Sequence, residues 1–210
     1  TYFNAICCLS VILIHVLSYP VTNCVKPSFA AAFVFVPWKI ASFVVQGFLF
    51  SGAMKMAVGF SDGAFDGYGK YLFGRLKKIV LPYAVWNVIY YAVYILTGYE
   101  TFSVSAFVRH LLLGTLSVLV FYIVIAVQLY LLRPLWHVMV NNIPGIVAVP
   151  FSVIITYFSM QTDTTLAHFG IEFGYADRLF TTYLAFWVIG LYAGKNADRF
   201  TDALNRKKCW

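Results

Sequence analysis

The chain of 210 residues is 61% hydrophobic, 19% aromatic and only 11% charged, with a formal net charge of +7 at pH 7. Soluble domains carry about 25% charged residues, so these proportions exclude a water-soluble domain and predict an integral membrane protein. The positive charge does not indicate nucleic acid in so apolar a chain, because basic residues of membrane proteins mark cytoplasmic loops and contact anionic lipid. We therefore expect membrane lipid, and no nucleic acid, among its partners.

Six hydrophobic segments have the length of a membrane-spanning helix, roughly 17–25 apolar residues. They are residues 3–19, 38–60, 79–97, 117–140, 145–161 and 179–195. The apolar segment 28–37, which ends at Pro37, is predicted to be a re-entrant or interfacial piece. Residues 105–113 are predicted to form a short amphipathic helix at the membrane surface. The sequence therefore predicts an all-α, polytopic transmembrane bundle of about six spans, with residues 1–210 as a single membrane domain.

The first predicted span carries an imidazole, His15, in a run whose only other ionisable groups are two thiols. A buried polar group without a partner costs several kcal/mol in hydrocarbon, so ionisable residues inside membranes are candidates for function. The alternative is a packing histidine bonded to a serine, a tyrosine or a backbone carbonyl. His15 follows Phe3 by twelve residues, about 18 Å of helix, which places the imidazole beyond the bilayer midplane.

The distribution of lysine and arginine predicts that the N-terminus is cytoplasmic. In that orientation eleven basic residues lie on the inner side: Lys55, Lys70, Arg75, Lys77, Lys78, Arg133, Lys195, Arg199, Arg206, Lys207 and Lys208. Four lie on the outer side: Lys26, Lys39, Arg109 and Arg178. This asymmetry follows the positive-inside rule. No acidic residue lies in the centre of a predicted span, which argues against a carboxylate proton relay or a carboxylate cation site.

The strongest basic cluster within the chain, Arg75-Leu76-Lys77-Lys78, precedes the third predicted span at its inner end. Arg75 and Lys78 are three residues apart and share a helix face, so they form a candidate pair for binding a diphosphate group. Ordinary anchoring at the cytoplasmic surface is the alternative. A cytoplasmic, phosphate-bearing donor bound at this pair would present its reactive end to His15.

Other candidate residues are weaker. Asn4, near the inner end of the first span, fits a helix-start position as well as contact with a donor. Polar or aromatic side chains that could line a pocket are Ser51, Trp86, Asn87, Gln128 and Tyr130. His110 and His137 are predicted to be interfacial, and His168 lies in an outer loop. The cysteines (Cys7, Cys8, Cys24 and Cys209) lack metal-ligand spacing, so no disulfide framework and no metal site is predicted.

Four segments of the first two-thirds of the chain resemble the acyltransferase 3 family, in the same order and spacing. They are FNAICCLSVILIHV (3–16), GFLFSGAMKM (47–56), YLFGRLKKIVLPYAVWNVIYY (71–91) and LLLGTLSVLVFYIVIAVQLYLLRPL (111–135). The shared features are a histidine in the first span, Ser-Gly in the second, a basic-x-x-basic motif followed by Pro-Tyr, and Tyr-Leu-x-x-Pro. Members of this family are multi-span membrane O-acyltransferases of cell-wall and surface polysaccharides and other extracytoplasmic acceptors.

The resemblance implies that His15 is catalytic and that Arg75 and Lys78, with Asn4, bind the acyl donor. The implied reaction moves an acyl group, expected to be acetyl, from cytoplasmic acyl-CoA to a hydroxyl of a glycan or lipid-linked acceptor at the cell membrane. Acyl-CoA, expected to be acetyl-CoA, would be a co-substrate, and no bound cofactor is implied. His15 would act as a general base or would carry the acyl group itself.

Three features depart from the family pattern. Asn4 stands where the family often has arginine, and Lys78 stands where the second basic position is often arginine. The six predicted spans are fewer than the family leads us to expect, so we expect the chain to be the N-terminal part of an acyltransferase 3 domain. Two other functions stay open. One is a component that exports a glycan or lipid-linked intermediate without chemistry, and the other is a catalytically silent scaffold.

Overall fold

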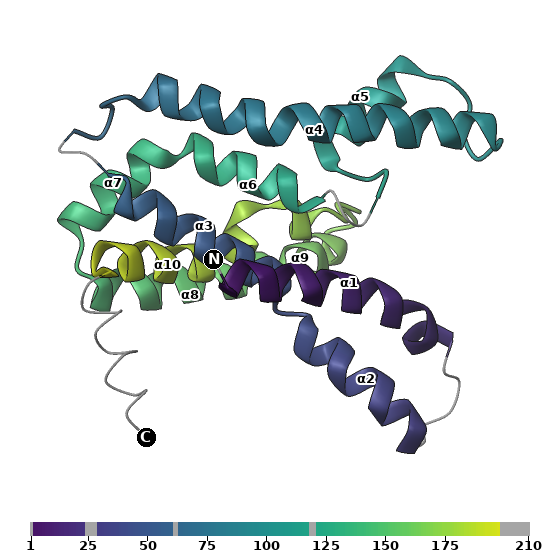
Figure 1. Ribbon diagram of the computed structural model, residues 1–210, viewed down its shortest axis with the longest axis horizontal. Helices are drawn as coiled ribbons and strands as arrows, with labels where there is room; N and C mark the ends of the chain where they lie inside the picture. The colour runs from purple at the N-terminus through teal and green to yellow at the C-terminus, as the bar shows by residue number, and fades with distance from the viewer. Residues whose placement is uncertain (1, 24–28, 61–62, 118–120, 198–210) are drawn as a thin grey trace.

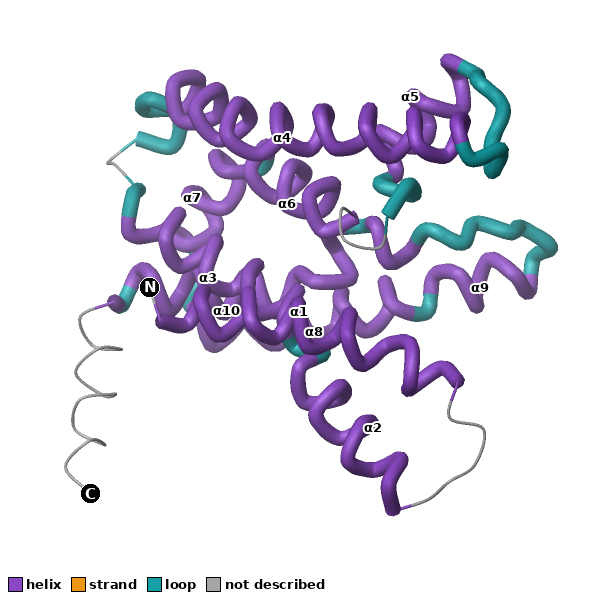
Figure 2. The backbone as a smooth tube through the Cα atoms, turned by 45° about the vertical axis from the view of Figure 1, so that its right-hand side comes forward, coloured by secondary structure: helices purple, strands orange, loops and turns teal. Residues whose placement is uncertain are grey.

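The computed structural model describes residues 2–23, 29–60, 63–117 and 121–197. Within these ranges the chain consists of α-helices, two short 3-10 helices and loops, with no β-strand (Figures 1 and 2). The predicted all-α class is therefore confirmed. Lys26, Arg199, Arg206, Lys207 and Lys208 lie outside these ranges, as do Cys24 and Cys209.

The first two helices, α1 (Tyr2–Asn23) and α2 (Phe29–Ala41), form a hairpin that projects from the rest of the molecule in both views (Figures 1 and 2). Pro37 lies inside α2, and the helix is interrupted only at residues 42–43, before α3 (Val44–Val58) begins. A proline costs the helix one backbone hydrogen bond. The helix nevertheless continues, because it satisfies the other backbone polar groups of this apolar segment internally. The structure therefore does not set this segment apart from the second predicted span, because Ala31–Val58 is long and apolar enough to count as one candidate span, while its depth in the membrane stays a prediction.

The core of the fold is the contact between α3 and α10 (Leu184–Lys195), with α8 (Gly145–Met160) packed against α10. Small residues let the two backbones approach closely. A Cβ atom on Gly190 would lie 2.5 Å from the carbonyl oxygen of Phe50 and 2.9 Å from the Cβ atom of Ala53. Gly194 meets Ala57 one turn further on. Because lipid is as apolar as the side chains, membrane helices associate through close packing of this kind.

The longest helix, α4 (Tyr68–Leu96), crosses one side of the molecule and packs against α6 (Phe121–Leu131) (Figure 1). The predicted third span began at residue 79, so the basic cluster lies within the helix and not before it. The predicted helix at 105–113 is confirmed as α5 (Val104–Leu113). Ser103 caps α5 by accepting a hydrogen bond from the Ala106 amide, and Gly114 ends it with a φ of +63°.

The described residues contain fewer helices of membrane-spanning length than the six or so spans predicted. Among the described residues, three helices are long and apolar enough to cross a membrane, or up to five if each bent pair is one span. The fourth predicted span bends by 59° between α6 and α7 (Arg133–Asn142), and α8 bends by 46° into α9 (Thr162–His168). Pro134 explains the first bend, because a proline cannot donate to the carbonyl of the preceding turn.

The sixth predicted span, 179–195, is shorter than expected. A 3-10 helix, η1 (Ala176–Arg178), precedes it, and its first part forms a second, η2 (Phe180–Tyr183), so that α10 has only 12 residues. Such a helix is about 18 Å long, which is less than the thickness of the hydrocarbon core.

Basic residues gather at one end of the molecule. The C-terminal ends of α3 and α10, the N-terminal end of α4 and the junction of α6 with α7 lie together there (Figure 1). These ends carry Lys55, Lys70, Arg75, Arg133 and Lys195. The positive-inside prediction requires such a grouping. The side of the membrane that this end faces stays a prediction.

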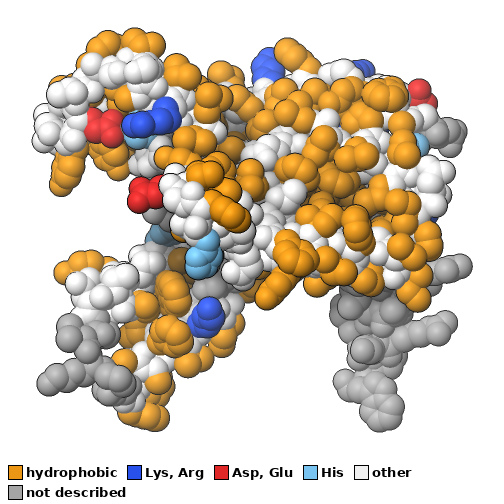
Figure 3. Space-filling model, turned by 180° about the vertical axis from the view of Figure 1, so that it is seen from behind, with side chains coloured by type: hydrophobic (Ala, Val, Ile, Leu, Met, Phe, Trp, Pro, Cys, Tyr) orange, Lys and Arg blue, Asp and Glu red, His pale blue; other side chains and the backbone are white. Residues whose placement is uncertain are grey.

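Large hydrophobic side chains are exposed on several helices, including Ile12 of α1, Phe33 of α2, Leu81 of α4 and Ile154 of α8. The face seen in Figure 3 is mainly hydrophobic, with few charged side chains on it. Contiguous apolar surface of this extent is unusual for a water-exposed monomer and is suited to contact with lipid.

Candidate active site

His15 lies on α1 at an apolar pocket of about 260 Å³ between α1, α3 and the start of α6. The pocket is lined by Val11, Ile14, His15, Ser42, Val44, Val45, Phe48, Phe121 and Tyr122. The His15 side chain is exposed and makes no hydrogen bond to another residue within the described ranges. It therefore has none of the contacts that a packing histidine would make to a serine, a tyrosine or a backbone carbonyl.

Two other polar side chains line this pocket. Ser42 is engaged locally, because its hydroxyl donates to the Trp38 carbonyl oxygen at 2.9 Å. Tyr122 packs its ring against Phe48, with 5.9 Å between the ring centroids. The pocket thus offers apolar walls and an accessible imidazole. Apolar walls suit a small acyl group, and an accessible imidazole beside them can accept a proton.

Arg75 lies on α4 and is half-buried against α6. Its guanidinium carbon is 5.5 Å from the centroid of the Tyr71 ring and 5.7 Å from that of Tyr130, both cation–π distances. Lys78 is exposed. Among the described residues, Lys78 makes no hydrogen bond, ion pair or ring contact, whereas Arg75 contacts two tyrosine rings. The structure therefore does not hold the two residues together as one clamp.

Asn4 and Ser51 join α1 to α3. The Ser51 hydroxyl donates a hydrogen bond of 2.7 Å to the Asn4 side-chain oxygen. The next residue, Gly52, lies against α6, where its Cβ atom would be 3.3 Å from the Tyr130 hydroxyl. This short stretch of α3 thus brings together three of the predicted site residues, Asn4, Ser51 and Tyr130.

Tyr122 connects the His15 pocket to Arg75. Its side chain lines the pocket and lies close enough to Arg75 and Tyr130 for electrostatic interaction with both. Tyr122 and Tyr130 are separated by about 12 Å along α6, at 1.5 Å per residue. The structure therefore arranges the predicted histidine and the predicted arginine around one helix, with tyrosines between them.

The other predicted pocket residues lie elsewhere. Trp86 is 54% exposed, and its ring contacts that of Tyr90 on the same helix. Asn87 is fully buried, and its amide donates to the Tyr83 carbonyl oxygen one turn earlier, at 2.8 Å. Neither side chain reaches the His15 pocket.

Gln128 has a bridging role. Its amide nitrogen donates to the Arg178 carbonyl oxygen at 2.8 Å, and its amide oxygen accepts from the Phe180 amide at 3.2 Å. It thereby holds η1 and η2 against α6. Gln128 also borders a second, almost wholly apolar pocket of about 400 Å³ between α4, α5 and α6.

Sequence reasoning missed Arg133, which was counted only as one of the inner basic residues. Arg133 is 4% exposed, and its guanidinium carbon lies 4.8 Å from the Tyr71 ring centroid and 5.6 Å from that of Phe60. His137, predicted to be interfacial, is buried and packs edge-on against Phe60 at 5.1 Å. The position of Arg133 inside the Tyr-Leu-x-x-Pro motif was the available signal.

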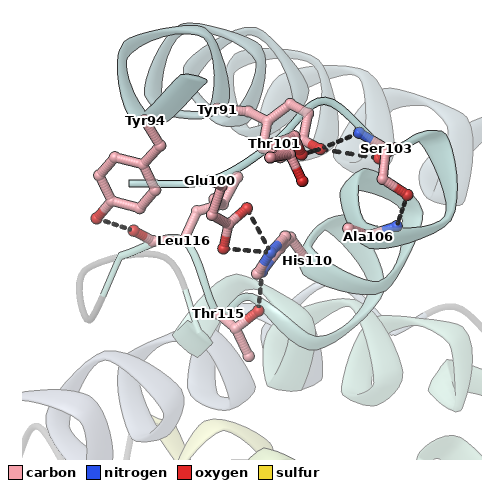
Figure 4. A network of polar contacts seen from close by, with 9 residues as sticks. All are labelled: Tyr91, Tyr94, Glu100, Thr101, Ser103, Ala106, His110, Thr115 and Leu116. Atoms are coloured by element: carbon pink, nitrogen blue, oxygen red, sulfur yellow. Dashed lines mark hydrogen bonds and ion pairs between the residues drawn. The ribbon is translucent and has the colours of Figure 1, made fainter. Parts of the chain in front are cut away.

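At the opposite end of α4, His110 holds two loops together (Figure 4). Its Nε2 atom is 3.1 Å from a Glu100 carboxylate oxygen, and its Nδ1 atom is 2.5 Å from the Thr115 hydroxyl. Tyr91 binds both the amide and the carbonyl of Ser103 through its hydroxyl, at 2.8 Å each. These bonds join the loop after α4 to the ends of α5.

The chain was compared with protein families, with curated proteins and with solved structures. The family model described as an acyltransferase domain, that of acyltransferase 3, matches residues 2–209. Neither the curated proteins nor the solved structures gave a significant match. Because the family model covers nearly the whole chain and the helices are those of a membrane protein, the chain belongs to the acyltransferase 3 family of membrane acyltransferases.

Proposed function

We propose that this protein transfers an acyl group, acetyl in the first instance, from cytoplasmic acyl-CoA to a hydroxyl group of an extracytoplasmic glycan or lipid-linked acceptor. The observation that carries the proposal is the position of His15. Its imidazole is accessible, makes no hydrogen bond to another described residue and borders an apolar pocket lined by Tyr122, which interacts electrostatically with Arg75. The family provides the reaction class, and this arrangement provides residues to perform it.

In the proposed reaction, neutral His15 accepts the proton of the acceptor hydroxyl while the hydroxyl oxygen attacks the thioester carbonyl. The carbon–oxygen bond forms, the carbon–sulfur bond breaks, and the coenzyme A thiol leaves with the proton. In the alternative sequence, an imidazole nitrogen attacks the thioester carbonyl and the coenzyme A thiol leaves with the imidazole proton. The acceptor hydroxyl then attacks the acyl carbon, the carbon–nitrogen bond breaks, and the hydroxyl proton returns to the imidazole. The apolar walls of the pocket suit the acyl chain in either case.

Donor binding would occur at the basic end of the molecule. Arg75 would contact the donor phosphates, with Lys78 at the exposed side of α4 and Asn4 at the start of α1. We place this end, and with it the N-terminus, on the cytoplasmic side of the cell membrane, because the basic residues gather there. The pantetheine arm of the donor would then extend along α6 from Arg75 toward Tyr122 and His15.

The test is transfer of labelled acetyl groups from acetyl-CoA by the purified protein in proteoliposomes, with a glycan acceptor on the opposite side. His15→Ala should abolish transfer, and His168→Ala is the matched control, since His168 lies at the exposed end of α9. A His15→Ala protein that transferred label at the wild-type rate would overturn the assignment. Label trapped on His15 in the absence of acceptor would select the acyl-histidine sequence over the general base.

A second candidate function is export of a glycan or lipid-linked intermediate. The two bent helix pairs favour it, since discontinuous helices are common at transport sites. Export measured in vesicles without any acyl donor distinguishes the two functions. Export that persists without a donor, combined with no acetyl transfer, would favour the exporter.

A further inference from the structure

We infer that Arg133 and Arg75, which both contact the Tyr71 ring, form a binding site for a phosphate group, with Arg133 taking the place of Lys78 in the pair expected from the sequence. That the phosphate belongs to the acyl donor rests on the proposed function. That the site binds a phosphate group at all rests on the buried and unsatisfied groups of this cluster.

The first observation is that Arg133 is a buried cation without an anionic partner in the described part of the chain. The ion pairs there join His110 to Glu100 and Arg178 to Asp177. Arg133 reaches only the carbonyl oxygens of Gly59 and Asp66, at 3.4 and 3.5 Å, which are long for hydrogen bonds. Burial of a charge is costly unless the charge is paired, so the environment of Arg133 favours an anionic ligand.

The second observation is that two neighbouring buried donors lack acceptors. The Arg133 Nε atom and the Tyr71 hydroxyl donate no hydrogen bond. They lie close together, because the Arg133 guanidinium carbon is 4.8 Å from the Tyr71 ring centroid, and the Arg75 guanidinium carbon is 5.5 Å from the same centroid. Buried polar groups in native proteins are normally satisfied, so these donors indicate a ligand rich in acceptor oxygens.

The third observation is the geometry of the guanidinium groups. Arginine presents a planar fork of donors that matches phosphate oxygens in a bidentate way, while lysine presents a single point charge. Both arginines contact the same Tyr71 ring, and half-buried Arg75 provides the approach from the surface. The bend ahead of Pro134 starts α7 at Arg133, where the side chain meets α4. An exposed Lys78 has no comparable enclosure.

The test measures binding of coenzyme A without an acyl group to the whole chain in detergent micelles, so that binding is read without catalysis. Arg133→Gln should raise the Kd about tenfold or more, as Arg75→Gln should, because each removes a charge-assisted bidentate contact. Lys77→Ala is the matched control on the exposed side of α4 and should leave the Kd within about twofold. If Arg133→Gln weakened binding no more than Lys77→Ala did, the inference would be wrong.

Two conservative variants distinguish lost binding from lost folding. Arg133→Lys keeps the positive charge but lacks the planar guanidinium, and Tyr71→Phe removes only the hydroxyl group. Each should raise the Kd for coenzyme A several-fold while circular dichroism and the thermal midpoint stay near those of the wild type. Wild-type Kd values in both variants would contradict the role of this cluster.

The same variants distinguish the source of the phosphate. Loss of coenzyme A binding, with unchanged binding of phosphatidylglycerol vesicles, identifies the donor. If the wild type does not bind coenzyme A and the variants lose binding to the vesicles, the phosphate belongs to a lipid headgroup. That result would contradict the proposed donor but would leave the phosphate site supported. The wild type could bind coenzyme A without transferring an acyl group, while Arg133→Gln loses that binding. This combination would support the phosphate site and overturn the proposed function. Wild-type protein that bound neither coenzyme A nor the vesicles nor inorganic phosphate would overturn the site.

Discussion

Ser51 of α3 donates a hydrogen bond of 2.7 Å to the side-chain oxygen of Asn4 on α1, and this bond holds the helix that carries His15 against the core. Asn4→Ala and Ser51→Ala should each lower the free energy of unfolding in micelles by about 1 kcal/mol. A double-mutant cycle should give a coupling of about 0.6 kcal/mol, which is typical of hydrogen bonds between membrane helices. Strict additivity of the two single variants would show that the bond contributes nothing.

The α3–α10 contact depends on the absence of a side chain at Gly190. Gly190→Ala would place a methyl group 2.5 Å from the Phe50 carbonyl oxygen, and overpacking of this kind costs about 1–3 kcal/mol. Thermal unfolding in micelles should show a lower midpoint. Gly74→Ala on α4 is the control, because nothing lies within 4 Å of its added methyl group. It should be neutral or stabilising, since alanine is the better helix former.

The size of the His15 pocket should set the preference for acyl chain length. Phe48→Ala would enlarge the pocket at its wall. Two further methylenes in an apolar site are worth about 0.8 kcal/mol each, so the ratio of butyryl to acetyl transfer should rise about tenfold. The measurement is competition between the two acyl-CoA donors in proteoliposomes. Phe73→Ala, at an exposed position of α4, should leave the ratio unchanged. An unaltered ratio in Phe48→Ala would mean that the acyl chain lies elsewhere.

The Glu100–His110 contact should stabilise the loops at the far end of α4 without affecting donor binding (Figure 4). Glu100→Gln removes the ion pair and should lower the free energy of unfolding by about 0.5–1 kcal/mol. Glu172→Gln, at an exposed loop position, is the control and should have no measurable effect. Coenzyme A binding by Glu100→Gln should equal that of the wild type. A loss of coenzyme A binding would show that this end of the molecule communicates with the basic end.

The helical elements were predicted well where the signals are local. Composition alone indicates membrane helices, because a chain with so few charges cannot cover itself with polar surface. The limits of α5 follow from its own capping residues, Ser103 and Gly114. The span count was predicted less well. Pro37 is accommodated within a helix while Pro134 accompanies a 59° bend, so the presence of a proline does not by itself predict where a span is broken.

The sequence by itself determined that this is an all-α membrane protein with an imidazole in its first helix and a basic cluster in α4. Those features depend on residue chemistry and on spacing along one helix, which are both local. Only the tertiary structure decided which side chains share a site: it turned Lys78 and Trp86 outward, engaged Asn4 and Gln128 in bonds between elements, and buried Arg133 beside Tyr71. The physical reason is that burial and pairing depend on contacts between segments far apart in the sequence, such as that of Arg133 on α7 with Tyr71 on α4, and no single segment encodes them.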